Sequence, residues 1–277
     1  MSRYSAMFER LGRRGEGAFG AFVMLGDPDL ETSAQILDGL VEGGADMIEL
    51  GIPFSDPIAD GPVIQAAARQ ALARGVRPAD CFDLLRAFRD RHSDIPVGLL
   101  TYANLVLARG RDAFCRAASE AGVDSLLVAD VPMLEAAPFL ASARSHRLAP
   151  ILIAAPNTPP ATLERIARQG EAYVYCVARP GVTGVDDALR LDHGVLLAAL
   201  RRYGSPPAVI GFGISRPDQV REALDAGAAG AISGSAIVRL IAEHPGEARE
   251  AVRGFVAAMK AATLADGEGQ RREAISL

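Results

Sequence analysis

The 277-residue sequence has no tryptophan and only three cysteines, and aromatic residues make up 5% of it. Cys81, Cys115 and Cys176 are odd in number and far apart, and they form no Cys-x-x-Cys pair. This pattern argues against a disulfide framework and is typical of reduced thiols packed as small apolar groups. A chain of this length buries roughly three quarters of its unfolded surface, so its core needs neither a disulfide nor a metal.

Charge of one sign is nowhere concentrated, since 29 Lys and Arg are balanced by 34 Asp and Glu. The absence of a basic stripe argues against a nucleic-acid groove. No apolar run reaches the length of a membrane span, and the opening stretch MSRYSAMFERLGRRGEG mixes charges throughout, unlike a signal peptide. We therefore expect a cytoplasmic protein that binds neither nucleic acid nor a membrane.

Several catalytic signatures are also missing. His92, His146, His193 and His244 show no metal-ligand spacing, and no His-Glu-x-x-His occurs, so we expect no metal. There is no Walker lysine, no complete dinucleotide fingerprint and no nucleophile elbow. No lysine lies within the apolar strands, which argues against a Schiff base. The chemistry must therefore come from carboxylates, backbone donors and shape.

Eight short β-rich runs alternate with longer segments of helical period. Most are continuously apolar, as expected for parallel strands covered on both faces, and they lie at 21–25, 47–50, 96–101, 125–130, 150–154, 172–177, 208–213 and 230–233. A joint of helix, glycine and strand recurs in GGADMIEL, AGVDSLLV and AGAAGAIS, which begin at residues 43, 121 and 226. The α/β pattern predicts a (β/α)8 TIM barrel, in preference to a doubly wound open sheet.

We expect a single barrel domain at 1–265, because no interdomain linker is visible. Residues 4–14 predict a short extra N-terminal helix with one apolar face. The segment 266–277 is polar and contains glycine, which predicts a flexible tail.

Two acids follow one another closely at the end of the second strand. In such barrels the loops after the strands form the active-site face, and the stretch MIELGIPFSDPIADGP places Glu49 and Asp60 there. A carboxylate in an apolar barrel mouth has a raised pKa, and two acids in different surroundings can divide acid and base roles. The structural alternatives are an ion pair of Glu49 with an arginine and a helix cap by Asp60, for a helix beginning near Gly61 or Pro62.

Other polar residues near strand ends carry weaker signals. Tyr102 follows the third strand, and Tyr175 lies near the end of the sixth. Asp56 and Asp130 stand in proline-containing turns, which are ordinary positions for aspartate.

Two neighbouring βα units both open with glycine and serine. GFGIS at 211–215 and ISGSAI at 232–237 each lead from a strand toward a helix, and Ser215 with Pro217 predicts a helix cap and first turn. Backbone N–H groups at helix starts bind phosphate, and barrel phosphate sites favour the loops after strands seven and eight. GVTG at 181–184 could close over the same group. Each segment alone could be a tight turn, but together they predict a phosphate-bearing ligand.

These residues resemble the α subunit family of tryptophan synthase over nearly the whole chain. The resemblance rests on ELGIPFSDPIADGP, GLLTYANLV, DSLLVADVP, GVTG, GFGIS and AGAAGAISGSAIV, which begin at residues 49, 98, 124, 181, 211 and 226. It implies retro-aldol cleavage of indole-3-glycerol phosphate to indole and glyceraldehyde 3-phosphate, in the final stage of tryptophan biosynthesis. The alternatives are a catalytically silent barrel kept as a binding subunit and a different phosphosugar enzyme such as an isomerase.

The resemblance also implies a role for each matching residue. Glu49 matches the acid–base carboxylate that protonates indole C3 and helps take a proton from the glycerol hydroxyl. Asp60 matches the carboxylate that stabilises positive charge at the indole nitrogen, and Tyr175 matches a residue beside these acids. The expected substrate contacts are Phe22, Leu100, Tyr102, Leu127, Ala129, Ile153, Thr183, Phe212 and Ile232, with Thr183 on a closing lid. The expected phosphate cradle is Gly184, Gly213, Gly234 and Ser235.

A partner is implied as well. The family's α subunit docks on a pyridoxal-phosphate β subunit in an α2β2 heterotetramer, and indole passes through an internal tunnel. Pro53, Asp56, Asn104 and Pro132 match partner-facing segments. The α chain itself is expected to bind no cofactor, and an autonomous lyase without a β partner is the alternative. The lid at 178–191 begins Ala-Arg-Pro-Gly, and Pro180 predicts a stiffer hinge than the serines typical of the family.

Overall fold

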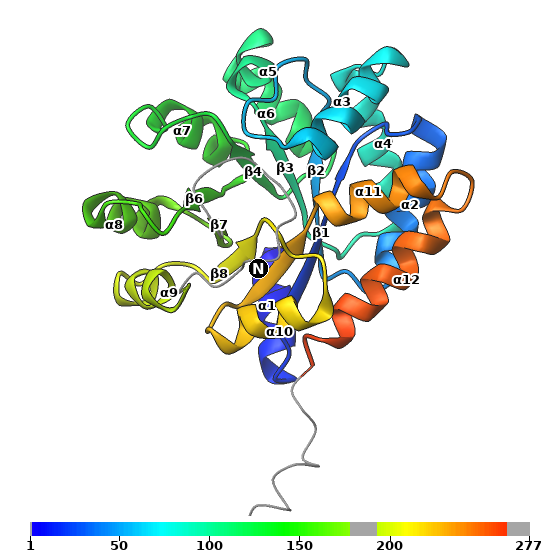
Figure 1. Cartoon of the computed structure of the whole chain (residues 1–277). Coiled ribbons are helices and arrows are strands. Elements are labelled where there is room, and N and C mark those ends of the chain that lie inside the picture. Colours follow the sequence, from blue (N-terminus) through cyan, green and yellow to red (C-terminus); the bar gives the residue numbers. More distant parts are fainter. Residues whose placement is uncertain (1, 178–192, 265–277) are drawn as a thin grey trace, which may run out of the picture.

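The computed structural model describes residues 2–177 and 193–264. Within these ranges one parallel sheet, ordered β5-β4-β3-β2-β1-β9-β8-β7-β6, stands at the centre of a ring of helices (Figure 1). Its strands are β1 (Ala18–Met24), β2 (Met47–Gly51), β3 (Val97–Thr101), β4 (Ser125–Val128), β5 (Ala149–Pro150), β6 (Leu152–Ala154), β7 (Val174–Val177), β8 (Ala208–Gly211) and β9 (Gly230–Ser233).

The sheet closes through its fifth barrel strand, which is interrupted at Ile151. The first half, β5, pairs with β4, and the second half, β6, pairs with β7. The two ends of the strand order are therefore consecutive in the chain, and the described residues form eight barrel strands. The predicted (β/α)8 barrel is confirmed.

The helices around the sheet often begin at proline. Pro62, Pro78, Pro160 and Pro217 each occupy the first helical position, where the missing N–H costs no hydrogen bond. The helices are α1 (Arg3–Arg13), α2 (Leu30–Glu42), α3 (Pro62–Ala73), α4 (Pro78–Arg91), α5 (Ala103–Ala108), α6 (Arg111–Glu120), α7 (Ala137–Ser145), α8 (Pro160–Gln169), α9 (His193–Arg202), α10 (Pro217–Asp225), α11 (Ser235–Glu243) and α12 (Ala248–Ala261).

Side chains of each strand divide between two apolar cores. On β1, Phe19 and Val23 pack in the outer core with the helices, whereas Phe22 and Met24 pack inside the barrel. Both faces are buried, which explains the continuous apolar runs in the sequence. The same alternation turns Glu49 inward, because its neighbours on β2 belong to the outer core.

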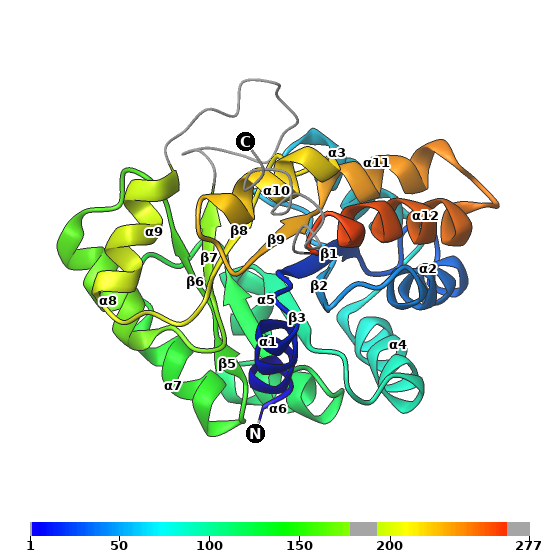
Figure 2. The same ribbon diagram turned by 90° about the horizontal axis from the view of Figure 1, so that it is seen from below.

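Helix α1 covers the N-terminal end of the strands (Figure 2). The hydroxyls of Tyr4 and Ser125 are 2.9 Å apart, and the Tyr4 ring lies 5.5 Å from the Tyr173 ring. Arg3 adds a 2.7 Å ion pair with Asp124. The predicted extra helix is confirmed, and it packs at the end of the barrel opposite the loops that follow the strands.

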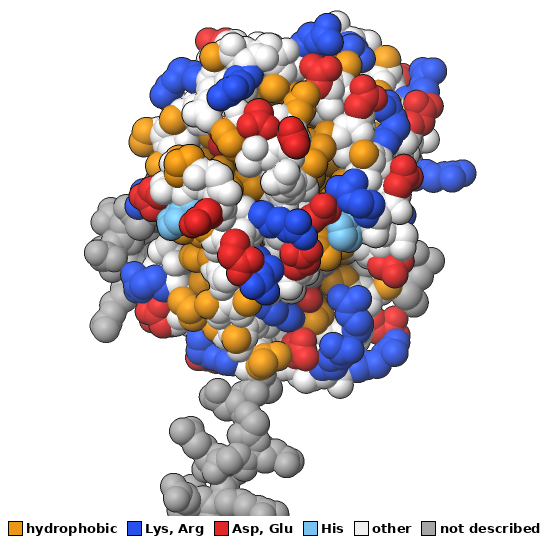
Figure 3. Space-filling model, turned by 90° about the vertical axis from the view of Figure 1, so that its right-hand side faces the viewer, with side chains coloured by type: hydrophobic (Ala, Val, Ile, Leu, Met, Phe, Trp, Pro, Cys, Tyr) orange, Lys and Arg blue, Asp and Glu red, His pale blue; other side chains and the backbone are white. Residues whose placement is uncertain are grey.

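The surface over α2 and α12 intersperses charges of both signs (Figure 3). Such a surface offers no single-sign field to a polyanion. No helix in the described ranges is both long and apolar enough to cross a bilayer. The predicted tail at 266–277 lies outside the described residues.

Candidate active site

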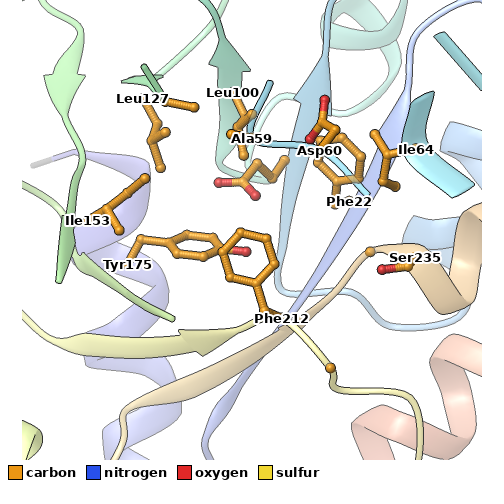
Figure 4. Close-up of a pocket in the computed structure, with 14 residues that line it drawn as sticks. Phe22, Ala59, Asp60, Ile64, Leu100, Leu127, Ile153, Tyr175, Phe212 and Ser235 are labelled. Carbon is orange, nitrogen blue, oxygen red and sulfur yellow. The ribbon is translucent and has the colours of Figure 1, made fainter. Parts of the chain in front are cut away.

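The loops that follow the strands surround a cavity lined by side chains from both halves of the barrel (Figure 4). Phe22 and Ile64 stand on one side, and Leu127 and Ile153 stand on the other. The complete lining is Phe22, Glu49, Ala59, Asp60, Ile64, Leu100, Leu127, Ala129, Ile153, Tyr175, Phe212, Gly213, Gly234 and Ser235. Most of the residues predicted to bind substrate and phosphate therefore share one apolar cavity with both predicted acids.

Glu49 is held inside the barrel by its strand and by one hydrogen bond. It pairs in register with Phe22 and Gly98, and its side chain is only 3% exposed. The hydroxyl of Tyr173 donates to Oε1 at 3.0 Å, whereas Oε2 has no hydrogen-bond partner among the described residues. Burial raises the pKa of Glu49 to about 7, and the Tyr173 hydroxyl opposes this shift. No arginine in the described ranges pairs with Glu49, so the structural alternative is not observed.

Asp60 is placed by a turn that contains proline. The N–H of Asp60 donates to the Pro57 carbonyl at 3.0 Å, and the side-chain amide of Gln65 donates to the Asp60 carbonyl at 2.7 Å. Burial raises the pKa of Asp60 to about 6. The N-cap of α3 is Gly61, so the alternative role of Asp60 as a helix cap is wrong.

Tyr102 lies beside Asp60 and outside the lining of the cavity. Its ring stacks on Phe54 with centroids 5.4 Å apart. Its hydroxyl partly offsets the rise in the pKa of Asp60 that burial causes. That hydroxyl is buried and makes no hydrogen bond of normal geometry within the described residues. Ile232, also predicted as a substrate contact, is buried in the inner core and is not among the residues that line the cavity.

Tyr175 and Phe212 form a pair of rings at the cavity edge (Figure 4). Their centroids are 5.7 Å apart at 71°. Burial raises the pKa of Tyr175 strongly, so the phenol stays protonated. A Cβ on Gly211 would lie 2.1 Å from the Tyr175 hydroxyl, which explains glycine at that position.

The loop between β8 and α10 begins with two residues in the left-handed conformation. Phe212 and Gly213 both have positive φ, 67° and 79°, so β8 ends at Gly211 and not at residue 213 as predicted. Gly234 is the N-cap of α11, and Ser235 is its first residue. Gly213 lines the same cavity as Gly234 and Ser235, and the helix N-terminus that these two residues form suits an anion. Thr183, Gly184 and the 178–191 lid with Pro180 lie outside the described residues.

The predicted cap of α10 is wrong in detail. The N-cap is Arg216, and Pro217 begins the helix. The side chain of Gln219 satisfies this end from within the helix, because its Oε1 accepts from the N–H groups of Ser215 at 2.8 Å and Arg216 at 3.1 Å. Gln219, in the first turn of α10, therefore caps this helix end in place of Ser215.

Asp130 has a structural role. Its Oδ1 accepts a 2.7 Å hydrogen bond from the N–H of Ala103, the first residue of α5. Its interpretation as an ordinary loop residue is therefore the better one.

Three site features were missed from sequence: Ala59, Ile64 and Tyr173.

The predicted partner-facing residues differ in exposure. Asp56, Asn104 and Pro132 are exposed, whereas Pro53 is buried within the chain. Three large apolar side chains in the same loops and helix also reach solvent, namely Ile58 at 71%, Leu107 at 46% and Leu134 at 79% exposed.

Comparison with known proteins decides the family. The protein-family model described as "Tryptophan synthase alpha chain" matches residues 8–266 of this chain. The tryptophan synthase alpha chain of Escherichia coli strain SMS-3-5 is 53% identical over 266 residues, which are 95% of this chain and 99% of that one. The Escherichia fergusonii protein of the same name is 52% identical with the same coverage.

The chain belongs to the tryptophan synthase alpha chain family. Solved structures agree with this placement. Mycobacterium tuberculosis tryptophan synthase matches with a TM-score of 0.87 and 29% identity, over 96% of this chain and 99% of that one. Tryptophan synthase subunit alpha from Legionella pneumophila matches with a TM-score of 0.85 and 31% identity, over 95% and 98%. The chain is thus a lyase of tryptophan biosynthesis that cleaves indole-3-glycerol phosphate, as the resemblance implied.

Proposed function

We propose that Glu49 and Asp60 divide the acid–base work of this cleavage, and that the chain passes indole to a pyridoxal-phosphate β subunit. One observation carries the assignment of roles: two buried carboxyl groups with raised pKa values line the same apolar cavity as a helix N-terminus. Bound there, the substrate places its indole among apolar side chains and its phosphate against backbone N–H groups.

The first step is transfer of a proton from Glu49 to indole C3. C3 becomes tetrahedral, and positive charge develops on the ring nitrogen. The Asp60 carboxylate accepts the hydrogen bond of that N–H and stabilises the charge. Since Asp60 has the lower pKa of the two acids, it is the one that is ionised when Glu49 still carries its proton.

The second step breaks the carbon–carbon bond. The Glu49 carboxylate takes the proton of the hydroxyl on the carbon attached to C3, and the O–H electrons form the aldehyde carbonyl. The electrons of the broken bond return to the ring, neutralise the nitrogen and release indole. Glu49 ends protonated, as it began. The protonated indole is the electron sink, so we infer that the reaction needs no cofactor in this chain.

The exposed apolar side chains support the β partner. Ile58, Leu107 and Leu134 lie close in sequence to Asp56, Asn104 and Pro132, and exposed apolar residues rimmed by polar ones are typical of protein interfaces. We propose that these six residues contact the β subunit in an α2β2 assembly. A cytoplasmic location agrees with the three free, buried cysteines.

The test is spectroscopic detection of indole from the purified chain and indole-3-glycerol phosphate, with and without a β subunit. Stimulation by the β subunit supports the partnership, and equal rates identify an autonomous lyase. Glu49→Gln should bind substrate and release no indole. Indole release at the wild-type rate would remove Glu49 from its proposed role, and no release by wild-type chain in either assay would indicate the silent barrel.

A further inference from the structure

The barrel wall is incompletely paired at one place. β4 and β5 pair only at Ser125↔Ala149 and Leu126↔Pro150, and β6 pairs with β7 alone. Beyond Leu126, the C-terminal part of β4 therefore has no strand pairing with β6. This seam lies toward the catalytic end of the barrel, because parallel strands all end there.

A cavity of about 410 Å³ fills the seam between β4, β6 and α8. We call it the seam cavity, and its lining is Val128, Ala129, Val131, Pro132, Met133, Ile151, Leu152, Ile153, Asn157, Thr158, Pro159, Thr162 and Ile166. This volume falls within the range of roughly 300–1,000 Å³ usual for small-molecule sites.

The seam cavity is lined by residues from both faces of the barrel wall. Its lining includes Val128 and Leu152, which pack with the outer core, and also Ala129 and Ile153, which pack with the inner core. A pocket confined to one side of a sheet would meet only alternate residues of each strand. Ala129 and Ile153 also line the catalytic cavity, so the two cavities share a wall of two side chains.

The lining discriminates between the two products of the reaction. None of the described residues that line the seam cavity is charged, and its polar side chains are Asn157, Thr158 and Thr162. A phosphorylated triose would lose its hydration there without gaining a cation from the lining, because the Arg165 guanidinium lies outside the lining and donates to the Met133 carbonyl. Indole is neutral and apolar, and its single N–H can donate to the side-chain oxygen of Asn157 or Thr162.

We propose that the seam cavity is a second subsite for indole, reached from the catalytic cavity past Ala129 and Ile153. The proposal rests on the proposed function, because cleavage supplies the indole. Movement of indole into the seam frees the catalytic cavity while the phosphorylated product leaves through the mouth of the barrel. Arg165 of α8 donates a 3.2 Å hydrogen bond to the Met133 carbonyl, which links α8 to the loop after β4 beside the seam cavity.

The experiment measures binding of indole to the full chain by equilibrium dialysis, with the catalytic cavity occupied. The blocking compound is an indole with a phosphorylated alkyl chain that lacks the hydroxyl needed for cleavage. Thr162→Phe fills the seam cavity from α8. Ala161→Phe adds the same ring to the same helix at an exposed position outside the cavity and is the matched control.

Wild-type chain and Ala161→Phe should bind indole in the presence of the blocking compound, and Thr162→Phe should lose at least about tenfold in affinity. Complete displacement of indole from wild-type chain, or wild-type binding by Thr162→Phe, would overturn the proposal. If Thr162→Phe does not fold, Val131→Phe fills the cavity from the loop after β4. Cleavage of indole-3-glycerol phosphate is assayed separately, so failure of the proposed function appears as lost turnover whatever the indole binding shows.

Discussion

The hydroxyl of Tyr173 donates a 3.0 Å hydrogen bond to Oε1 of Glu49 where both side chains are almost wholly buried, 1% and 3% exposed. This bond fixes the carboxyl and favours its ionised form, against the effect of burial. Tyr173 therefore moderates the rise in the pKa of Glu49 that burial causes.

Tyr173→Phe should raise the pKa of Glu49 further and move the alkaline limb of the rate profile to higher pH. We expect turnover to fall by about tenfold, because a carboxyl without its donor is less well positioned. Tyr4→Phe is the control, since it removes a buried hydroxyl that bonds Ser125 and leaves the bond to Glu49 in place. A limb that stays put in Tyr173→Phe, or moves equally in Tyr4→Phe, would contradict this role.

The pH dependence of kcat/KM should be bell-shaped. Asp60 acts as a carboxylate, so the rate falls below its pKa of about 6. Glu49 first acts as an acid, so the rate falls above its pKa of about 7. Measurement from about pH 5 to pH 9 checks this, because kcat/KM reports the free enzyme. A profile that rises steadily through this range would show that Glu49 begins the reaction ionised.

Glu49 should also cost stability at high pH. Its pKa is about 7 in the folded chain against an ordinary value of 4.5, so the unfolded chain loses this proton first as pH rises. The free energy of unfolding therefore falls by about 3 kcal/mol as pH rises from the ordinary pKa of Glu49 to its pKa in the folded chain.

Glu49→Gln should match wild-type stability near pH 4 and exceed it by up to about 3 kcal/mol near pH 8 in urea unfolding. Glu243→Gln, at an exposed position on α11, is the control and should leave the pH dependence unchanged. A constant difference between Glu49→Gln and wild type at all pH values would mean that Glu49 titrates alike in both states.

Gly211→Ala should destabilise the chain by about 1–3 kcal/mol and lower activity, because its Cβ would meet the Tyr175 hydroxyl at 2.1 Å. Tyr175→Ala in the same chain should remove part of that cost, and a double-mutant cycle measures the coupling. Gly254→Ala is the control, because its Cβ meets nothing within 4 Å in the middle of α12. Purely additive effects would show that the contact is not the cause.

The fold was predictable because most strands are apolar on both faces, which indicates a parallel sheet covered on both sides, and because eight such runs occur. The residues at which strands end were harder to predict from the sequence. The predicted strand at 208–213 ends at Gly211, because Phe212 takes the left-handed conformation, which its side chain does not favour. The break of the fifth strand at Ile151 has no local signal beyond the preceding Pro150, which cannot donate to a ladder.

Glu49 was predictable because a charge inside an apolar run is conspicuous, and Asp60 was predictable because it follows the same strand in a loop that contains proline. Ala59 and Ile64 were missed, because small and aliphatic residues carry no chemical signal in a loop or first helical turn. Tyr173 could have been found, since it is two residues from Tyr175 and shares its face at a period of two. Tyr102 was predicted to contact the substrate, but it does not line the cavity. Its ring stacks on Phe54, a contact that only the folded chain reveals.

Docking of α1 has a consequence for synthesis. Arg3 and Tyr4 leave the ribosome first, but they bond to Asp124 and Ser125, and β1 must wait for Gly230–Ser233 to supply its second neighbour. Until then the nascent chain carries an unpaired strand edge and an uncovered apolar helix face, the features that chaperones recognise and that promote aggregation. Release of nearly the whole polypeptide must therefore precede closure, which makes folding of this enzyme essentially post-translational.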